Sequence, residues 1–181
     1  VYTYEYIGGS FKNDDTFLPF HDPIDPNPPG HVTGSFTLSA PLPPSSYTDL
    51  SLSGSSLVSY SFTNGPVTIN NTNGVIYSFW VKTNAQGQVI ESSIQVQKWR
   101  DTPGVGRYFD DIEIGYPSIF NKGYYNVNCS LMGEGNFCVA MDLSGDYSQS
   151  VWESGSWQAP PAFVVNSPQI YTGLPINAEV T

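Results

Sequence analysis

Few side chains in this sequence have the chemistry of a catalytic centre. It contains two histidines, His21 and His31, and sixteen Asp and Glu residues. It has no Gly-x-Ser-x-Gly elbow, no His-Glu-x-x-His pair and no Gly-x-x-x-x-Gly-Lys phosphate loop. A His paired with a distant Ser or Thr, or two carboxyl groups about 5–10 Å apart, could still support hydrolysis. The sequence therefore predicts no catalytic residue, and a hydrolase with an unrecognised site is the least favoured of three functional classes.

The two cysteines are candidates for a covalent bond. Cys129 and Cys138 are nine residues apart and flank a Gly-Glu-Gly-Asn turn. Two strands joined by such a turn bring cross-strand side chains together, so we expect a disulfide. Two free buried thiols are the alternative. A zinc pair is less favoured, because structural zinc takes four N or S ligands and both histidines are far away in the sequence.

Acidic residues form two groups. Four aspartates lie in a proline-rich loop at 12–30: Asp14, Asp15, Asp22 and Asp25. Calcium binds oxygen ligands of this kind in exposed loops, so a Ca²⁺ site is one interpretation. Solvated acids with Asp-Pro turn roles are the simpler one. The second group, Asp110, Asp111 and Glu113, is interpreted as a turn followed by the solvent face of a strand.

Four tryptophans are the other residues that could contact a ligand: Trp80, Trp99, Trp152 and Trp157. The first two lie opposite the apolar faces of their strands, and the last two lie in a Ser- and Gly-rich region where we expect a turn. Exposed planar rings stack on sugars and anchor protein interfaces. The alternative is that each ring packs on the second face of a two-layer fold.

Alternation with a period of two residues runs along the chain and predicts strands. We expect them at 1–7, 31–39, 57–63, 67–70, 75–83, 88–99, 111–115, 124–131, 136–143 and 162–172. Within three of these strands, alternation places one set of apolar side chains on the inward face: Val32, Phe36 and Leu38; Val58, Tyr60 and Phe62; and Val75, Tyr77, Phe79 and Val81. Asn84-Ala85-Gln86-Gly87 predicts a hairpin turn in which Gly87 has a positive φ. Nine or ten short strands with negligible helix predict an all-β fold. We expect an antiparallel β-sandwich, and a jelly-roll-like or barrel-like arrangement is the alternative.

Composition limits the class of partner. The 181 residues fit one domain, 1–181, with the proline-rich loop at 12–30 as its main irregular segment. Six basic and sixteen acidic residues give a net charge of −10, which disfavours nucleic acids and anionic membranes. No apolar run approaches the ~18–20 residues that span a bilayer. The predicted partners are other copies of the chain, with an extracellular polysaccharide as the alternative.

The N-terminal segment is a candidate assembly strand. Tyr2, Tyr4 and Tyr6 alternate in a stretch of high β propensity that must pair with another strand. The twenty or so residues that follow include five prolines, and such a linker could carry the strand to a neighbouring copy. Pairing within its own sandwich is the favoured interpretation. Exchange between copies is the alternative, and it would allow a filament to grow.

Several segments resemble one known family. They are YTYEYIGGSF, HVTGSFTLSAPLPPSSYTDLSL, LVSYSFTNGPVTINN and VIYSFWVKTNAQGQVIESSIQV. They resemble exported bacterial β-rich domains of unknown function that are often associated with PEP-CTERM sorting tails. The resemblance implies export and a β fold, and it supplies no catalytic residue.

Secretion and a structural role are the functional expectation. Valine at position 1 suggests a mature chain from which a leader has been removed, and a disulfide suits an oxidising compartment. We therefore expect a secreted, non-enzymatic surface protein that self-associates in a matrix, sheath or filament. A carbohydrate-binding module that uses exposed Trp and Tyr is the alternative, followed by the hydrolase.

Overall fold

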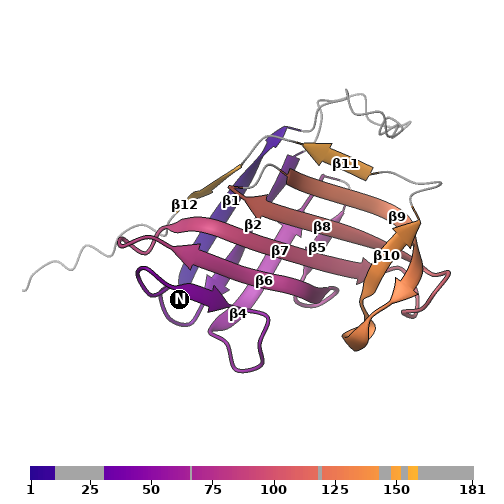
Figure 1. Cartoon of the computed structure of the whole chain (residues 1–181), viewed down its shortest axis with the longest axis horizontal. Helices are drawn as coiled ribbons and strands as arrows, with labels where there is room; N and C mark the ends of the chain where they lie inside the picture. The colour runs from indigo at the N-terminus through magenta and orange to yellow at the C-terminus, as the bar shows by residue number, and fades with distance from the viewer. Residues whose placement is uncertain (11–30, 66, 118–119, 143–147, 152–154, 159–181) are drawn as a thin grey trace, which may run out of the picture.

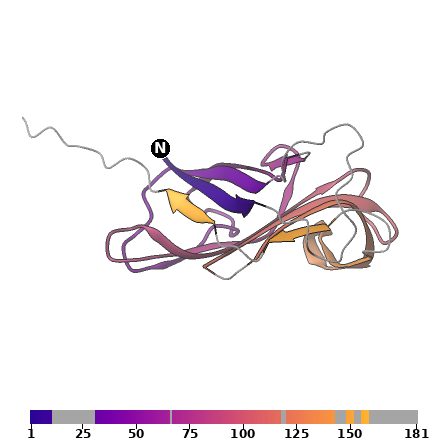
Figure 2. The ribbon, with the colours of Figure 1, turned by 90° about the horizontal axis from the view of Figure 1, so that it is seen from above.

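The chain folds into two antiparallel β-sheets that pack face to face (Figures 1 and 2). A computed structural model describes residues 1–10, 31–65, 67–117, 120–142, 148–151 and 155–158. Strands dominate these ranges, as the sequence predicts, and the helix they contain is the three-residue turn η1 (Glu134–Asn136). No helix in the described ranges could cross a membrane. The predicted loop at 12–30 and the predicted strand at 162–172 lie outside these residues.

The first sheet has five strands. In spatial order they are β12 (Ser156–Gln158), β1 (Tyr2–Ser10), β2 (His31–Leu38), β4 (Leu57–Thr63) and β5 (Thr68–Asn70). The candidate assembly strand β1 is paired on both sides within its own chain, with Tyr6 opposite Gly34 of β2 and Trp157 of β12. Tyr4 and Tyr6 are buried and Tyr2 packs against the core, so the three tyrosines share the inner face.

The second sheet has seven strands. Six of them follow in the order β10 (Cys138–Asp142), β9 (Phe120–Met132), β8 (Tyr108–Tyr116), β7 (Val89–Trp99), β6 (Val75–Thr83) and β3 (Tyr47–Asp49), and β11 (Ser148–Val151) also pairs with β9. The described residues alone contain twelve strands, more than the expected nine or ten. Alternation does not predict β3, β11 and β12, because three or four residues are too few to show it.

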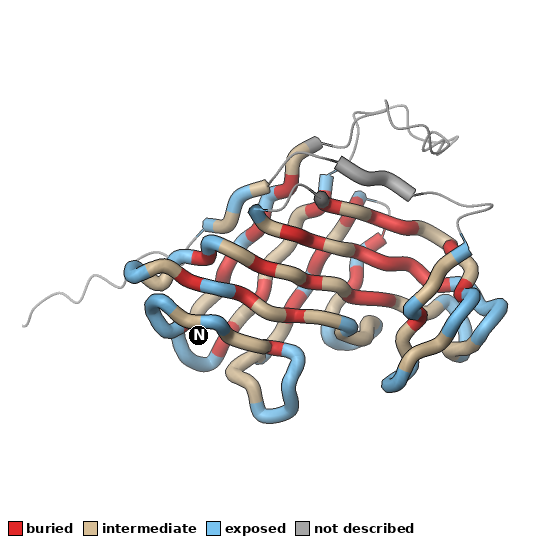
Figure 3. The backbone as a smooth tube through the Cα atoms, viewed as in Figure 1, coloured by how far each residue is buried: buried red, intermediate tan, exposed pale blue. Residues whose placement is uncertain are grey.

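The main core lies between the sheets. Buried residues alternate with less buried ones along many of the strands (Figure 3). Val32, Phe36 and Leu38 of β2 are buried, as predicted. The ring of Phe36 lies 5.3 Å from that of Phe79 in the opposite sheet, in an edge-to-face arrangement. Aromatic contacts of this kind join the two layers and fix their spacing.

Two predicted core residues lie outside the core. Tyr77 was expected to face inward with Phe79, but it is exposed because the β6–β7 register shifts between Ile76 and Ser78. A bulge of this kind reverses the alternation on one side of it, so Ile76 packs against the core instead. Val58 is likewise exposed, next to a register shift at Leu38.

The predicted β6–β7 hairpin is confirmed. Gly87 has φ +74°, and the side-chain oxygen of Asn84 accepts hydrogen bonds from the backbone N–H groups of Gln86 and Gln88. These contacts provide hydrogen-bond partners for the backbone N–H groups of the turn, and they fix the position of Gln88 just before β7.

Candidate functional site

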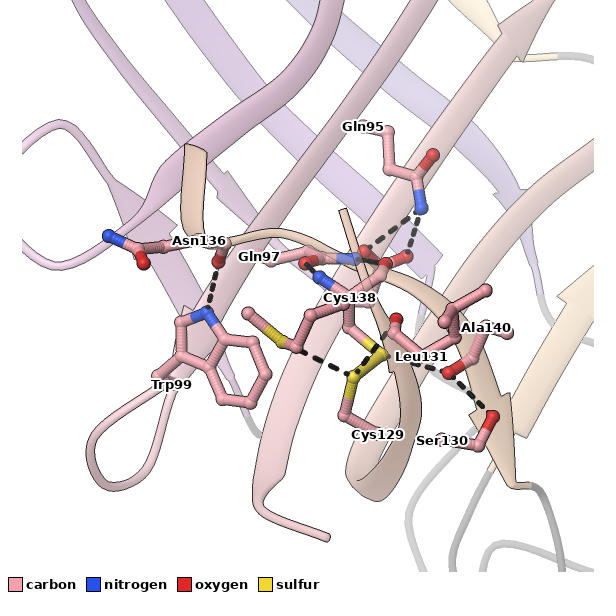
Figure 4. Close-up of a disulfide and its surroundings, with 11 residues drawn as sticks. Gln95, Gln97, Trp99, Cys129, Ser130, Leu131, Asn136, Cys138 and Ala140 are labelled. Carbon is pink, nitrogen blue, oxygen red and sulfur yellow. Dashed lines mark hydrogen bonds between the residues drawn. A yellow bond between two sulfur atoms is a disulfide. The ribbon is translucent and has the colours of Figure 1, made fainter. Parts of the chain in front are cut away.

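The disulfide predicted from the cysteine spacing is present between β9 and β10 (Figure 4). Cys129 and Cys138 are not directly opposite each other, because register shifts place Cys138 opposite Met132 and Cys129 opposite Met141. The connecting turn is η1, in which Gly135 has φ +71°. A disulfide is compatible with an oxidising compartment.

The β9–β10 hairpin covers part of the outer face of the seven-stranded sheet. Gln97 of β7 donates from Nε2 to the carbonyl oxygen of Cys138 and accepts from the Cys138 N–H, both at 2.9 Å (Figure 4). A second core forms beneath the hairpin. Its buried members are Phe109, Tyr124, Val127, Cys129 and Cys138.

Trp99 belongs to this second core. Its ring lies 5.1 Å from that of Phe109, and its Nε1–H donates to the carbonyl oxygen of Asn136 at 2.8 Å. This contact corresponds to the packing alternative for Trp99, and the bond to Asn136 ties the hairpin turn to the sheet.

A row of polar side chains continues along the same outer face. Gln95 and Gln97 of β7, Asp111 and Glu113 of β8 and Lys122 of β9 occupy facing register positions. Gln95 donates to both carboxylate oxygens of Asp111 at 3.2 and 3.3 Å and to Glu113 at 3.3 Å. Lys122 forms an ion pair with Glu113 at 3.4 Å. The row places two carboxyl groups next to each other, with one of them wholly buried.

The interpretation of Asp110, Asp111 and Glu113 as a turn and a solvent face is wrong. Asp110 and Asp111 are buried and Glu113 is half-buried. Asp111 lies opposite Gln97 on the face that the β9–β10 hairpin covers, which alternation alone marks as exposed. Asp110 is enclosed by its contacts with Arg100 and Asn126. Burial raises the pKa of Asp111 well above its usual range, and the nearby charge of Glu113 raises that pKa further. Hydrogen bonds from Gln95 and Gln97 act in the opposite direction.

Asp110 serves a different contact. Arg100 donates to its Oδ1 from Nε at 3.0 Å and from Nη2 at 2.8 Å, and the backbone N–H of Asn126 donates to the same oxygen at 2.9 Å. Arg100 also lies 4.2 Å above the ring of Tyr125. These bonds join the end of β7 to β8 and to the middle of β9, which is a structural use of a carboxylate.

We expect Asp111→Asn to change the pH dependence of stability. The folded pKa of Asp111 lies above the unfolded value of about 3.9, so between these two values the folded state binds more protons. The contribution of Asp111 to the free energy of unfolding therefore falls as pH rises through this window. Asparagine keeps the shape and can donate to Glu113 without a charge, so the variant should be about 1 kcal/mol more stable than wild type at neutral pH.

Urea unfolding of both proteins between about pH 4 and pH 8 measures this difference. Asp101→Asn is the matched control, because Asp101 is exposed. An Asp111→Asn variant that loses stability at neutral pH as well as at low pH would contradict the account, since it would mean that the carboxylate itself stabilises the fold.

Trp80 lies on the outer face, opposite the buried side chains of Phe79 and Val81, as predicted. It is half-buried, and its ring lies 5.3 Å from that of Tyr47 in β3. This pair is therefore available on the surface, near the edge of the seven-stranded sheet. Trp152, the other candidate in the C-terminal region, lies outside the described residues.

The prediction that Trp157 lies in a turn is wrong. It belongs to β12, and its ring centroid lies 4.9 Å from that of Tyr6 and 5.3 Å from that of Phe36. Pairing of β12 with β1 directs residue 157 toward the core, a long-range effect that the local sequence does not report. Its Nε1–H donates to Ser92 Oγ at 3.1 Å, so Trp157 connects the two sheets.

A pocket of about 220 Å³ opens beside Trp157 at the margin between the sheets. Three aromatic residues and two glutamines contribute to its wall, together with the start of β7: Tyr4, Tyr116, Trp157, Gln88 and Gln158. Tyr4, Tyr116 and both glutamines are not predicted from the sequence as pocket residues. They come from four separated segments, and no local pattern marks residues that only the packing of two sheets brings together.

The proposed calcium ligands cannot be placed. Asp14, Asp15, Asp22 and Asp25 lie outside the described residues. In the part of the chain that the structure describes, no group of three or more His, Cys, Asp or Glu side chains could hold a metal ion.

Comparison with known proteins gives no relative for this chain. No protein-family model, curated protein or solved structure matches it.

Proposed function

We propose that the chain is a secreted, non-enzymatic structural protein that self-associates on or near the surface of a bacterial cell. The observation that supports this proposal best is the incompletely paired edge of the seven-stranded sheet. The disulfide is compatible with this setting, because such bonds persist outside the cytosol.

The edge consists of β6 and the short strand β3. β3 pairs with Trp80, Val81 and Lys82 of β6. Beyond Phe79, which accepts a hydrogen bond from Leu50, the segment Val75–Ser78 has no strand on that side among the described residues. We name this segment the β6 margin. Exposed backbone groups on a sheet edge can pair with a strand from another chain.

Aromatic side chains surround the β6 margin. Tyr47 is 61% exposed and Tyr77 is 45% exposed. Tyr47 contacts Trp80, and Tyr77 lies 5.4 Å from Phe137 in an edge-to-face arrangement. Tyr and Trp are enriched at protein interfaces, because they bury a large rigid area with little loss of conformational entropy. This composition favours a protein partner at the edge.

A second copy of the chain fits the margin. Antiparallel pairing of two β6 margins would give a two-fold dimer in which the aromatic groups meet across the new ladder. The margin is four residues long and contains a bulge at Tyr77, so we expect weak association that depends on concentration. Growth beyond a dimer needs a second contact elsewhere on the chain, because β1 is already paired on both sides within its own sheet.

We expect Tyr77→Lys to reduce self-association by about tenfold or more, because a lysine at an edge opposes strand addition and the paired copies would bring like charges together. Sedimentation velocity over a series of protein concentrations measures the change. Tyr108→Lys is the control, because Tyr108 is 43% exposed but lies at the start of β8, away from the β6 margin.

Equal association constants for the two variants would exclude the β6 margin as the contact. A wild-type chain that stays monomeric at the highest soluble concentration would exclude self-association itself. Urea unfolding of each variant shows whether a change in association reflects a change in fold.

A further inference from the structure

We infer that the pocket beside Trp157 binds a single uncharged sugar ring of the pyranose type. The pocket holds about 220 Å³, below the 300–1,000 Å³ typical of sites for drug-sized ligands, so it suits one small ring. This inference is independent of self-association, because the pocket lies between β12 and the start of β7 while the β6 margin lies at the β3 edge of its sheet.

The lining residues match the two kinds of surface on a sugar ring, its apolar C–H face and its rim of hydroxyl groups. Tyr4, Tyr116 and Trp157 contribute aromatic surface to the wall, and such surface suits the partly positive C–H groups of a pyranose face. Gln88 and Gln158 supply carboxamides, which can both donate to and accept from hydroxyl groups. A purely apolar ligand would leave these amides without partners, and this favours a ligand with one apolar face and a polar rim.

Three of the lining side chains are held from outside the pocket. Trp157 donates to Ser92, Tyr4 accepts from the backbone N–H of Leu42 at 2.9 Å, and the Gln88 Oε1 accepts from Asn84 Nδ2 at 2.9 Å. These bonds leave the Tyr4 O–H and the Gln88 Nε2–H groups as donors. Side chains fixed before binding lose little entropy when a ligand arrives, so the pocket is preorganised.

The charge of the pocket lining and of the whole chain determines which class of sugar fits the site. Among the described residues, no Lys, Arg, Asp or Glu lines the pocket, so an ionised ligand would lose hydration there without gaining an ion pair from them. The chain's net charge of −10 further disfavours acidic sugars. Neutral pyranosides therefore fit the site better than uronic acids or amino sugars.

Titration of the ¹⁵N-labelled chain with methyl glucoside, methyl galactoside, methyl mannoside and N-acetylglucosamine tests the inference. At least one of these probes should shift the indole N–H resonance of Trp157 with saturable, millimolar affinity. Glucuronate and glucosamine should bind more weakly than the matching neutral sugar. Gln88→Ala should weaken binding by about five- to tenfold, the effect of one lost hydrogen bond.

Gln86→Ala is the matched control, because Gln86 is an exposed glutamine in the same hairpin that does not line the pocket. Its affinity should equal that of wild type. The inference is overturned if none of the four neutral probes shifts Trp157, if charged and neutral sugars bind equally, or if Gln86→Ala and Gln88→Ala have the same effect. None of these outcomes changes the association constant measured by sedimentation, so the two proposals fail separately.

Discussion

Gly34→Ala is expected to destabilise the fold by about 3 kcal/mol or more, although it adds only one methyl group. Gly34 lies in β2 between Tyr6 of β1 and Phe62 of β4. A Cβ atom at this position would overlap the carbonyl oxygen of Ser61 and lie 2.5 Å from Cδ1 and 2.7 Å from Cα of Phe62. Two of these three atoms belong to the backbone of β4, so relief requires β2 and β4 to separate and lose ladder hydrogen bonds.

Urea unfolding of Gly34→Ala measures the loss, with Gly104→Ala as the control. The added Cβ of Gly104 would have as its neighbour the flexible Arg107 side chain at 3.4 Å, and the free energy of unfolding should stay within about 0.5 kcal/mol of wild type. A Gly34→Ala variant as stable as Gly104→Ala would mean that the close approach of β2 to β4 is incorrect.

Replacing both Cys129 and Cys138 with serine should lower the free energy of unfolding by about 2.5–3 kcal/mol. The disulfide closes a loop with a sequence separation of nine residues, and the estimate is the loss of that constraint on the unfolded chain. The hairpin should also loosen locally, so hydrogen exchange at the Cys138 N–H, which donates to Gln97, should accelerate.

The control is Ser130→Ala, which removes a side-chain bond to Ala140 in the same hairpin but keeps the disulfide. It should cost about 1 kcal/mol or less. Mass measurement before and after reduction of the wild-type chain establishes the bond itself. A mass unchanged by reductant, or a double variant as stable as wild type, would contradict the role given to the disulfide.

Local patterns predict much of this fold. Alternation places Val32, Phe36 and Leu38 correctly, because β2 runs through the middle of its sheet with one face on the core. The hairpin at Gly87 and the cysteine pair are also predictable, since both depend on residues that are close in the sequence. A short hairpin joins two neighbouring strands that run in opposite directions, so such turns also predict antiparallel sheets.

Contacts between distant segments are not predictable in this way. Alternation predicts that Asp111 faces solvent, but it is buried because the β9–β10 hairpin covers that face of the sheet. Alternation predicts that Tyr77 faces the core, but a bulge in β6 turns its side chain to the exposed face. The local sequence predicts a turn at Trp157, but pairing of β12 with β1 places this residue against the core. In each case a partner from another part of the chain determines which face of the strand is covered.

Hydrogen exchange at the β6 margin, measured as protein concentration rises, tests the proposed self-association most directly. If a second copy pairs with this edge, backbone amides within Val75–Ser78 should exchange more slowly at concentrations where the chain associates, while amides of the exposed β7–β8 turn near Val105 should not change. Protection that rises elsewhere while Val75–Ser78 stays unchanged would contradict strand addition at the β6 margin.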